Sequence, residues 1–267
     1  RAAPGLPDLR AVDFHSSGWI GALALSDSLI DTRAQSLVLS AGVTAKRLSG
    51  DLGSMPNSRD RIFVLNAAGA YLSSDPWGRT FVNLEGRQGV GLMNATREGD
   101  PLVSRLHGDA EYSALLLDAM RLQTLSDNLD LLLSFSGQIS SRALLAPEQC
   151  GYGGATFGRG FDDSELQGDL CAMGSAELRY TPHWKPGPSV TLLQFYTFAD
   201  GGAVQQRGAL LYGEQRSQDA VSAGVGVRFG LASGLSGSLE FAQPFLRDVS
   251  QQGNRDGRIF AAISWAR

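Results

Sequence analysis

Apolar and polar residues alternate with a period of two through almost the whole chain, and no other feature restricts its fold as strongly. The alternation begins near Gly18 and continues to the end of the sequence. In the segment 219–229 one face carries Val221, Ala223, Val225, Val227 and Phe229, and the other carries Ala220, Ser222, Gly224, Gly226 and Arg228. Because successive side chains of a strand point to opposite faces, the pattern predicts an all-β protein.

The two faces differ in chemical character, and that difference separates a membrane protein from a soluble one. In 174–180 one face carries Ala176, Leu178 and Tyr180, and the other carries Ser175, Glu177 and Arg179. A moderately apolar face suits lipid, whereas small residues mixed with paired charges suit a water-filled lumen. A soluble β-sandwich also alternates and stays as an alternative. Segments of roughly 10–14 residues favour a transmembrane barrel, because soluble strands average about 5–6.

Turn signals divide the alternating sequence into about eleven strands. We predict them at 17–26, 34–47, 60–73, 79–91, 106–121, 128–140, 170–181, 189–200, 218–230, 234–243 and 257–266. The connections alternate between short turns and longer loops such as 92–105, 141–169 and 201–217, as in outer-membrane barrels. Closed bacterial barrels normally have an even number of strands. We therefore expect either one miscounted strand or further strands upstream of Arg1, where the chain starts without a methionine.

Composition and motifs exclude several functional classes. The formal net charge is −4 and Lys occurs only at Lys46 and Lys185, which argues against a nucleic-acid partner. No run approaches the ~18 apolar residues of a transmembrane helix. The glycine cluster 153–160 lacks the Lys-Ser/Thr of a phosphate loop, and the acidic stretch 162–165 lacks the ligand ladder of a calcium loop. The sequence predicts no enzyme, no cofactor and no metal.

One loop has an unusual composition, "GGATFGRGFDDSELQGD" at 153–169. A single arginine, Arg159, lies among glycines and acids. Cys150 and Cys171 flank the loop, and such a pair suggests a disulfide if the compartment is oxidising. The alternative is that they are two unrelated small apolar residues.

The segment from Glu148 to Tyr180, "EQCGYGGATFGRGFDDSELQGDLCAMGSAELRY", resembles a known family. Its order of Glu-Gln, Gly-Gly, Arg-Gly-Phe, acids, Gly-Asp and Glu-Leu-Arg is similar to that of the TpsB transporters of two-partner secretion. Upstream, "LSDSLIDTRAQSLVLSAG" resembles another segment of the family at Leu29-Ile30 and Arg33-Ala34-Gln35. These haemolysin-type secretion proteins share a superfamily with the barrel-assembly protein BamA. The resemblance covers roughly 27–267.

The resemblance implies a sixteen-stranded barrel in the outer membrane of a Gram-negative bacterium, preceded by POTRA domains. Residues 1–267 would then be its C-terminal part, with the POTRA domains and first strands upstream. The loop 141–169 would fold into the lumen with Arg159, Gly160 and Phe161 as its tip. The wall partner would be Asp200 of Phe198-Ala199-Asp200, and the remaining matches to the family pattern are Gly154, Gly168, Asp169 and Glu177.

The function that this resemblance implies is secretion of a large adhesin or haemolysin from the periplasm to the cell surface. The implied partners are the unfolded exoprotein, membrane lipid and the barrel-assembly machinery. The sequence departs from the family pattern at three places. Gly158 stands where the family has a valine, and Leu170-Cys171 follows Gly-Asp where the family has x-Gly. The chain ends in Trp265-Ala266-Arg267, whereas the family usually ends in an aromatic residue. A related assembly barrel and a passive porin are the alternative functions.

Overall fold

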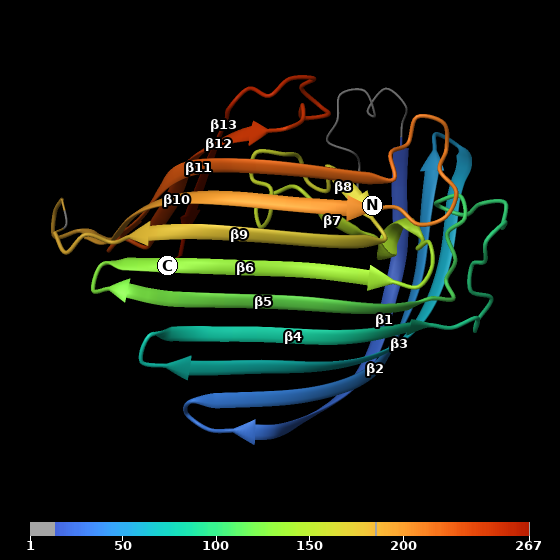
Figure 1. The fold of residues 1–267 in the computed structure, drawn as a ribbon, viewed down its shortest axis with the longest axis horizontal. Coiled ribbons are helices and arrows are strands. Elements are labelled where there is room, and N and C mark those ends of the chain that lie inside the picture. Colours follow the sequence, from blue (N-terminus) through green and yellow to red (C-terminus); the bar gives the residue numbers. More distant parts are fainter. Residues whose placement is uncertain (1–13, 185, 267) are drawn as a thin grey trace.

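The computed structural model describes residues 14–184 and 186–266 of the chain, and its main element is one antiparallel sheet (Figure 1). The sheet has eleven strands, which pair in the order of the sequence. They are β1 (Phe14–Asp31), β2 (Gln35–Leu52), β3 (Met55–Asp75), β4 (Gly78–Gly89), β5 (Ser113–Ser126), β6 (Leu129–Ser140), β9 (Leu170–Tyr180), β10 (Val190–Gln205), β11 (Ser217–Leu231), β12 (Leu235–Phe245) and β13 (Arg258–Trp265). The short pair β7 (Cys150–Tyr152) and β8 (Leu166–Gly168) and the 3-10 turn η1 (Ala146–Glu148) lie in the β6–β9 loop.

The eleven strands confirm the predicted all-β class and strand count within the described residues. The strand predicted at 106–121 was placed too early, because it runs from Ser113 to Ser126. Ala110 and Tyr112 continue the apolar alternation but belong to a buried cluster beneath the loops. The loop predicted from residue 201 is shorter, since β10 continues to Gln205. The β7–β8 pair was not predicted.

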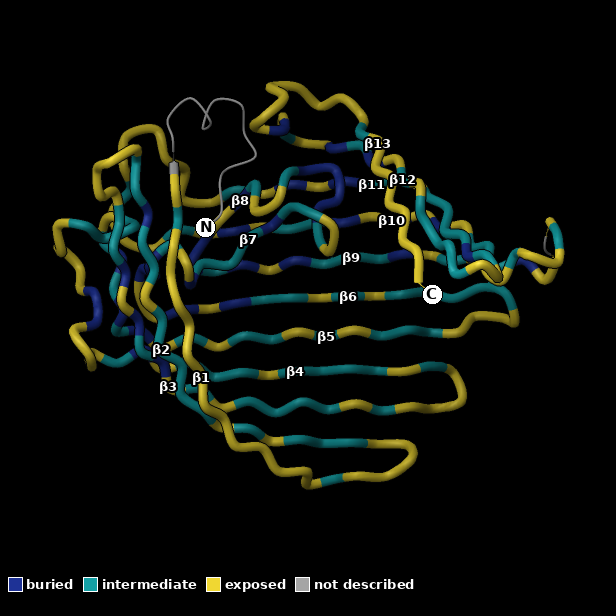
Figure 2. The backbone as a smooth tube through the Cα atoms, turned by 180° about the vertical axis from the view of Figure 1, so that it is seen from behind, coloured by how far each residue is buried: buried dark blue, intermediate teal, exposed yellow. Residues whose placement is uncertain are grey.

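The predicted alternation of faces is present in the sheet. On β11, Ala220 and Ser222 are fully buried, whereas Val221 is 37% exposed and Val225 is 55% exposed. One face of the sheet therefore points to solvent or lipid, and the other points into the space enclosed by the curved sheet. Figure 2 shows the exposed class along most of β1 and β13, whereas single buried residues recur along β9–β11 among intermediate and exposed ones.

The sheet curves without closing in the described part of the chain. β1 and β13 are its two edge strands and do not pair with each other there. The described residues form this one large sheet and the small β7–β8 pair, rather than the two large packed sheets of a sandwich. No helix of the described part has the length and apolarity needed to cross a membrane.

The connections separate the two ends of the sheet. The turns after β1, β3, β5 and β11 are short and lie at one end, on the left in Figure 1. The loops 90–112, 141–169, 206–216 and 246–257 lie at the opposite end. The turn between β2 and β3 is the one short connection at the long-loop end. We refer below to the short-turn end and the long-loop end.

Candidate functional site

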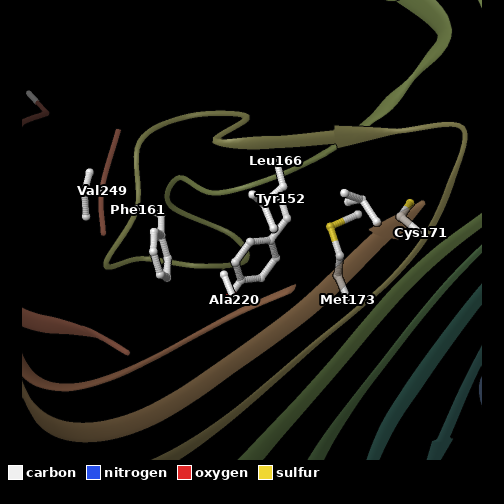
Figure 3. Packing of buried hydrophobic residues seen from close by; sticks show 8 residues of the cluster. Tyr152, Phe161, Leu166, Cys171, Met173, Ala220 and Val249 are labelled. Atoms are coloured by element: carbon white, nitrogen blue, oxygen red, sulfur yellow. The ribbon is translucent and has the colours of Figure 1, made fainter. Parts of the chain in front are cut away.

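The candidate site is the β6–β9 loop and the part of the inner sheet face on which it packs. The loop lies on the concave side of the sheet (Figures 1 and 2). Its buried apolar residues form one cluster with residues of the strands and of the 246–257 loop: Tyr152, Phe161, Leu166, Cys171, Met173, Val204, Ala220 and Val249. Figure 3 shows Phe161 and Tyr152 beside Ala220 of β11. The loop is thus packed against the inner face rather than extended into solvent.

Arg159 forms the most extensive contact between this loop and the strands. Its Nε donates to Oδ2 of Asp200 at 3.0 Å and its Nη2 donates to Oδ1 at 2.8 Å. The backbone N–H of Arg159 also donates to Oδ2 of Asp200, at 3.0 Å. Nη1 donates to Oε2 of Glu177 at 2.5 Å, and Nη2 donates to Oγ of Ser175 at 3.1 Å. The two Asp200 contacts of the side chain use the planar fork of a guanidinium, which matches a carboxylate.

Contacts with aromatic rings and close backbone packing also hold the tip on the inner face of the sheet. The guanidinium carbon of Arg159 lies 3.4 Å from the ring centroid of Phe198, within the range of a cation–π contact. Phe161 is 2% exposed, and its ring centroid is 6.0 Å from that of Tyr152. Gly160 between them approaches β11 and β12 so closely that a Cβ there would be 2.9 Å from the Cβ of Ser222. The sequence Arg-Gly-Phe therefore places a cation, a close backbone contact and an apolar ring in succession.

The charges around Arg159 balance. Glu177 accepts further hydrogen bonds from Arg179 at 2.7 Å and from Arg228 at 2.8 Å. Glu240 lies 3.6 Å from Nη1 of Arg159. Three guanidinium groups, of Arg159, Arg179 and Arg228, therefore face three carboxylates, of Asp200, Glu177 and Glu240. Buried ions are tolerated when they are paired and hydrogen-bonded in this way.

The carboxylates keep Arg159 charged in its buried position. Burial by itself would lower the pKa of the guanidinium, but hydrogen bonds and charge from Asp200 and Glu177 outweigh that effect and raise the pKa. Burial, with the charge of Asp200, raises the pKa of the Tyr152 hydroxyl beside it. The tip therefore stays a cation in its buried position.

A disulfide and an ion pair hold the base of the loop. Cys150 of β7 and Cys171 of β9 are joined by a disulfide with a Cα–Cα distance of 6.4 Å. Asp169 is fully buried and accepts from both terminal nitrogens of Arg105, at 2.6 and 2.9 Å. It also accepts from the backbone N–H groups of Leu144 and Arg207. Asp169 thus connects three long loops, 90–112, 141–169 and 206–216.

A second buried carboxylate holds the first limb of the loop to the opposite side of the sheet. Glu148 accepts from Nζ of Lys46 on β2 at 2.6 Å and from the hydroxyl of Tyr112 at 2.7 Å. Arg87 of β4 lies 3.9 Å away. Ion pairs at both limbs and at the tip therefore attach the loop to strands between β2 and β12 and to the 90–112 loop.

The structure brings most of the predicted site residues together, and it adds others. Arg159, Gly160, Phe161, Phe198, Asp200 and Glu177 form one cluster, and Asp169 lies in the separate ion pair at the base. Gly168 packs against the backbone of Gln205, and Gly154 has a left-handed φ of 97° within the loop. Sequence reasoning did not identify Ser175 as a contact of Arg159, although the alternation put it on the same face as Glu177. It also missed Arg105, Arg228 and Glu240, which no local pattern distinguishes.

The arrangement suits binding and positioning of chain segments. Among the described residues, no group of three or more His, Cys, Asp or Glu side chains is placed to hold a metal ion. The charged groups of the cluster form hydrogen bonds and ion pairs with one another across five elements: the loop, β9, β10, β11 and β12.

Comparisons with solved structures identify the fold. CdiB from Escherichia coli is 17% identical, with 94% of this chain and 46% of that chain covered and a TM-score of 0.77. CdiB from Acinetobacter baumannii is 16% identical, with 93% and 42% covered and a TM-score of 0.69. BamA from Haemophilus ducreyi, in a form lacking POTRA domains 1-3, is 12% identical, with 94% and 54% covered and a TM-score of 0.62. The chain spans about half the length of these structures.

Sequence comparison identifies the family. No curated protein matches the chain. The family model described as haemolysin secretion/activation protein ShlB/FhaC/HecB matches residues 9–229, which is most of the chain. Membership of this outer-membrane, two-partner secretion family confirms the resemblance to TpsB proteins and classes the chain with transporters rather than enzymes. The chain belongs to the ShlB/FhaC/HecB family of haemolysin secretion/activation proteins.

Proposed function

We propose that this chain forms part of the wall of an outer-membrane pore that secretes a partner exoprotein, of adhesin or haemolysin type, from the periplasm to the cell surface. Family membership supports the secretion role. The curved sheet, apolar outside and polar inside, supports a wall between lipid and a wet lumen. The observation that carries the proposal is the burial of Arg159, from a loop inside the sheet, against Asp200 and Glu177.

The rest of the wall would come from further strands of the full-length protein. Among the described residues, β1 and β13 each have one edge with unpaired backbone groups, and each such group costs several kcal/mol in lipid. Additional strands would satisfy them and complete the sixteen-stranded form of the family. In this proposal residues 1–267 are the C-terminal part of the barrel, and POTRA domains precede the barrel on the periplasmic side. The 46% coverage of CdiB from Escherichia coli supports a longer protein.

The loop would act as the movable element of the pore. A wide lumen leaks unless something fills it, and the loop occupies the space inside the sheet. The unfolded exoprotein would pass along the polar inner face, and the tip would shift from Asp200 to let it pass. The gain from the Arg159–Asp200 pair is offset by desolvation, so the pair fixes position more than it adds stability. A modest difference in free energy between the attached and the shifted position of the tip suits a gate.

Two further partners would be membrane lipid and the machinery that assembles outer-membrane barrels. Membrane lipid would cover the apolar outer face, and the barrel-assembly machinery would insert the protein. The proposal assigns no nucleic acid and no cofactor to this chain.

The test uses cells that express the full-length protein together with its exoprotein. Arg159→Ala removes every side-chain contact of the tip cation, so we expect secretion to fall by about tenfold or more while the protein stays in the outer membrane. The measurement is the amount of exoprotein in the medium and in the periplasm. Arg97→Ala is the matched control, because Arg97 is 66% exposed in the 90–112 loop. Unchanged secretion by Arg159→Ala would overturn the role of the tip.

The fold similarity to BamA supports a related assembly barrel as the second candidate. Depletion of the protein separates the two functions. Loss of one exoprotein from the medium supports secretion, whereas a general loss of outer-membrane proteins supports assembly. A passive porin fits the tightly attached loop less well, since its lumen would stay open.

A further inference from the structure

Two arginines that have no partner among the described residues lie side by side on the outer face of the sheet. Arg47 of β2 and Arg61 of β3 are direct cross-strand partners, and both are exposed. Within the described residues, neither guanidinium has a hydrogen bond or an ion pair. Like charges placed directly opposite each other across two strands are destabilising. An anion bound between them would remove that repulsion.

Neighbouring residues fix the direction of these side chains. Lys46 points inward, because its Nζ reaches Glu148 on the loop. Ile62 is 3% exposed and belongs to the inner cluster. Since successive side chains of a strand alternate between faces, Arg47 and Arg61 point outward.

The pair lies at the level where the outer apolar band ends. On β2 the outward residues Leu37, Leu39, Ala41, Val43 and Ala45 precede Arg47, and on β3 Phe63, Leu65, Ala67, Gly69 and Tyr71 follow Arg61. Residues 37–45 and 63–71 are nine-residue stretches, close to the ~9–11 residues with which a strand crosses a bilayer. The pair therefore lies at the headgroup level of the long-loop end, which is the external end in barrels of this kind.

A groove with apolar walls adjoins the pair. It has a volume of about 250 Å³ and is lined by Trp19, Ala45, Lys46, Arg47, Arg61, Ile62, Phe63, Leu92 and Met93. Trp19 of β1 is the direct cross-strand partner of Arg47 and is 55% exposed. Leu92 and Met93 of the 90–112 loop are 57% and 74% exposed.

The loop segment that carries Leu92 and Met93 is held in place beside Arg61. The backbone N–H of Arg61 donates to Oγ1 of Thr96 at 2.9 Å, and the backbone N–H of Thr96 donates to the carbonyl of Arg61 at 2.9 Å. Met93 and Asn94 adopt left-handed φ values of 55° and 56°, which are uncommon for residues other than glycine. The apolar side of the groove is therefore built by a fixed segment.

We propose that the Arg47–Arg61 groove binds a phosphorylated glycolipid of the outer leaflet. A phosphate between the two guanidinium groups would accept several of their N–H donors. One acyl chain would lie along Trp19, Leu92 and Met93, since aromatic side chains favour the bilayer interface. Charge complementarity and an adjoining apolar surface together fit a lipid rather than a soluble anion. The inference rests on the outer-membrane location given under the proposed function.

The test titrates the purified full-length protein, in detergent, with bisphosphorylated lipid A and counts bound lipid by native mass spectrometry. We expect one tightly bound molecule, and binding weaker by about tenfold or more in the double variant Arg47→Gln/Arg61→Gln. Arg33→Gln is the matched control, because Arg33 is an exposed arginine in the turn at the opposite end. It should bind as the wild type does.

Two further arms define the source of the phosphate. Lipid A without phosphate groups and inorganic phosphate alone should each fail to bind. Equal binding of lipid A by the wild type and the double variant would overturn the proposal, and so would equal binding of the phosphate-free lipid. Saturation by inorganic phosphate alone would overturn it in favour of a soluble anion.

The outcome can be separated from failure of the proposed function. Retention of heat-dependent mobility on gels by the double variant shows that it is folded. A protein absent from outer-membrane fractions would contradict the location and therefore the pore. A protein that is present there, secretes its exoprotein and binds lipid A independently of Arg47 and Arg61 would contradict only the lipid site.

Discussion

Gly160 lies where the loop tip has no room for a side chain. A Cβ at this position would lie 2.9 Å from the Cβ of Ser222 and 3.0 Å from the backbone nitrogen of Pro244. Both neighbours belong to strands of the sheet, so the tip rather than the wall must move. We expect Gly160→Ala to lift the tip, at a cost of about 1–3 kcal/mol. The measurement is the rate of limited proteolysis within 153–165, which should rise.

Gly187 offers the matched control for this substitution. A Cβ there would meet nothing within 4 Å. Gly187→Ala should leave the proteolysis rate at the wild-type value. A Gly160→Ala protein as resistant as the wild type would show that the tip does not pack as closely as described.

Glu177 forms ion pairs with three arginines, so removing its charge should leave the cluster around the tip with excess positive charge. Glu177→Gln leaves three guanidinium groups facing two carboxylates in the cluster. Removing one partner of a buried ion pair typically costs about 3–5 kcal/mol. We expect the tip to detach more readily, with faster proteolysis of the loop. Adding Arg228→Gln restores equal numbers of charges and should recover part of the loss.

A double-mutant cycle with these two substitutions measures the coupling. Additive effects of Glu177→Gln and Arg228→Gln on the proteolysis rate would contradict the charge-balance argument. Glu85→Gln is a suitable control, because Glu85 pairs with Arg87 on β4, away from the tip.

At the scale of residues, alternation indicated which side chains share a face of a strand, but not which of them contact Arg159. Ser175, Glu177 and Arg179 are two apart, and the structure places them on one inner face with the tip cation. The resemblance to a family, not the residues themselves, pointed to Asp200. Glu240 and Arg228 join the cluster only because the register of β10–β12 brings them beside one another, and register depends on the whole sheet.

At the scale of elements, the disulfide at the loop base and the ion pairs at the limbs both hold the two limbs of the β6–β9 loop in place. The cysteines are 21 residues apart, and closing a loop of that size contributes about 3 kcal/mol. The Arg105–Asp169 pair and the Glu148 contacts hold the same limbs without it. We therefore expect Cys150→Ser/Cys171→Ser to lower the thermal midpoint by a few degrees and to leave secretion near the wild-type level.

A reducing agent provides the control for the disulfide. It should lower the midpoint of the wild type to that of the double variant and leave the double variant unchanged. Loss of secretion on reduction would show that the ion pairs alone cannot hold the loop.

Strand existence was easier to predict than strand ends. Period-two alternation identified every strand of the large sheet, because each one separates two unlike environments. It failed at Ala110 and Tyr112, where a loop buries apolar residues with strand-like spacing. It also missed β7 and β8, whose three residues each are too short to show a period.

At the scale of the whole molecule, tryptophans mark both ends of the outer apolar band. Trp77 and Trp184 lie in connections at the short-turn end, and Trp265 lies at the end of β13 on the same side. Trp19 lies near the long-loop end of β1, beside the Arg47–Arg61 groove. All four side chains are exposed, with values of 67%, 62%, 64% and 55% in that order. Girdles of aromatic residues at the two interfaces are typical of membrane barrels.

This distribution predicts shallow burial of all four rings in a bilayer. In vesicles of brominated lipids, bromines near the headgroups should quench the fluorescence of the full-length protein more strongly than bromines deep in the acyl chains. Trp19→Phe should reduce the emission. It should keep the ratio of shallow to deep quenching, because the other three rings of this chain lie equally shallow at the opposite interface. Stronger quenching by deep bromines would place the rings in the bilayer centre and shift the band away from residues 37–45 and 63–71. Absence of quenching at both depths would contradict lipid contact at the outer face, and with it the position assigned to the Arg47–Arg61 groove.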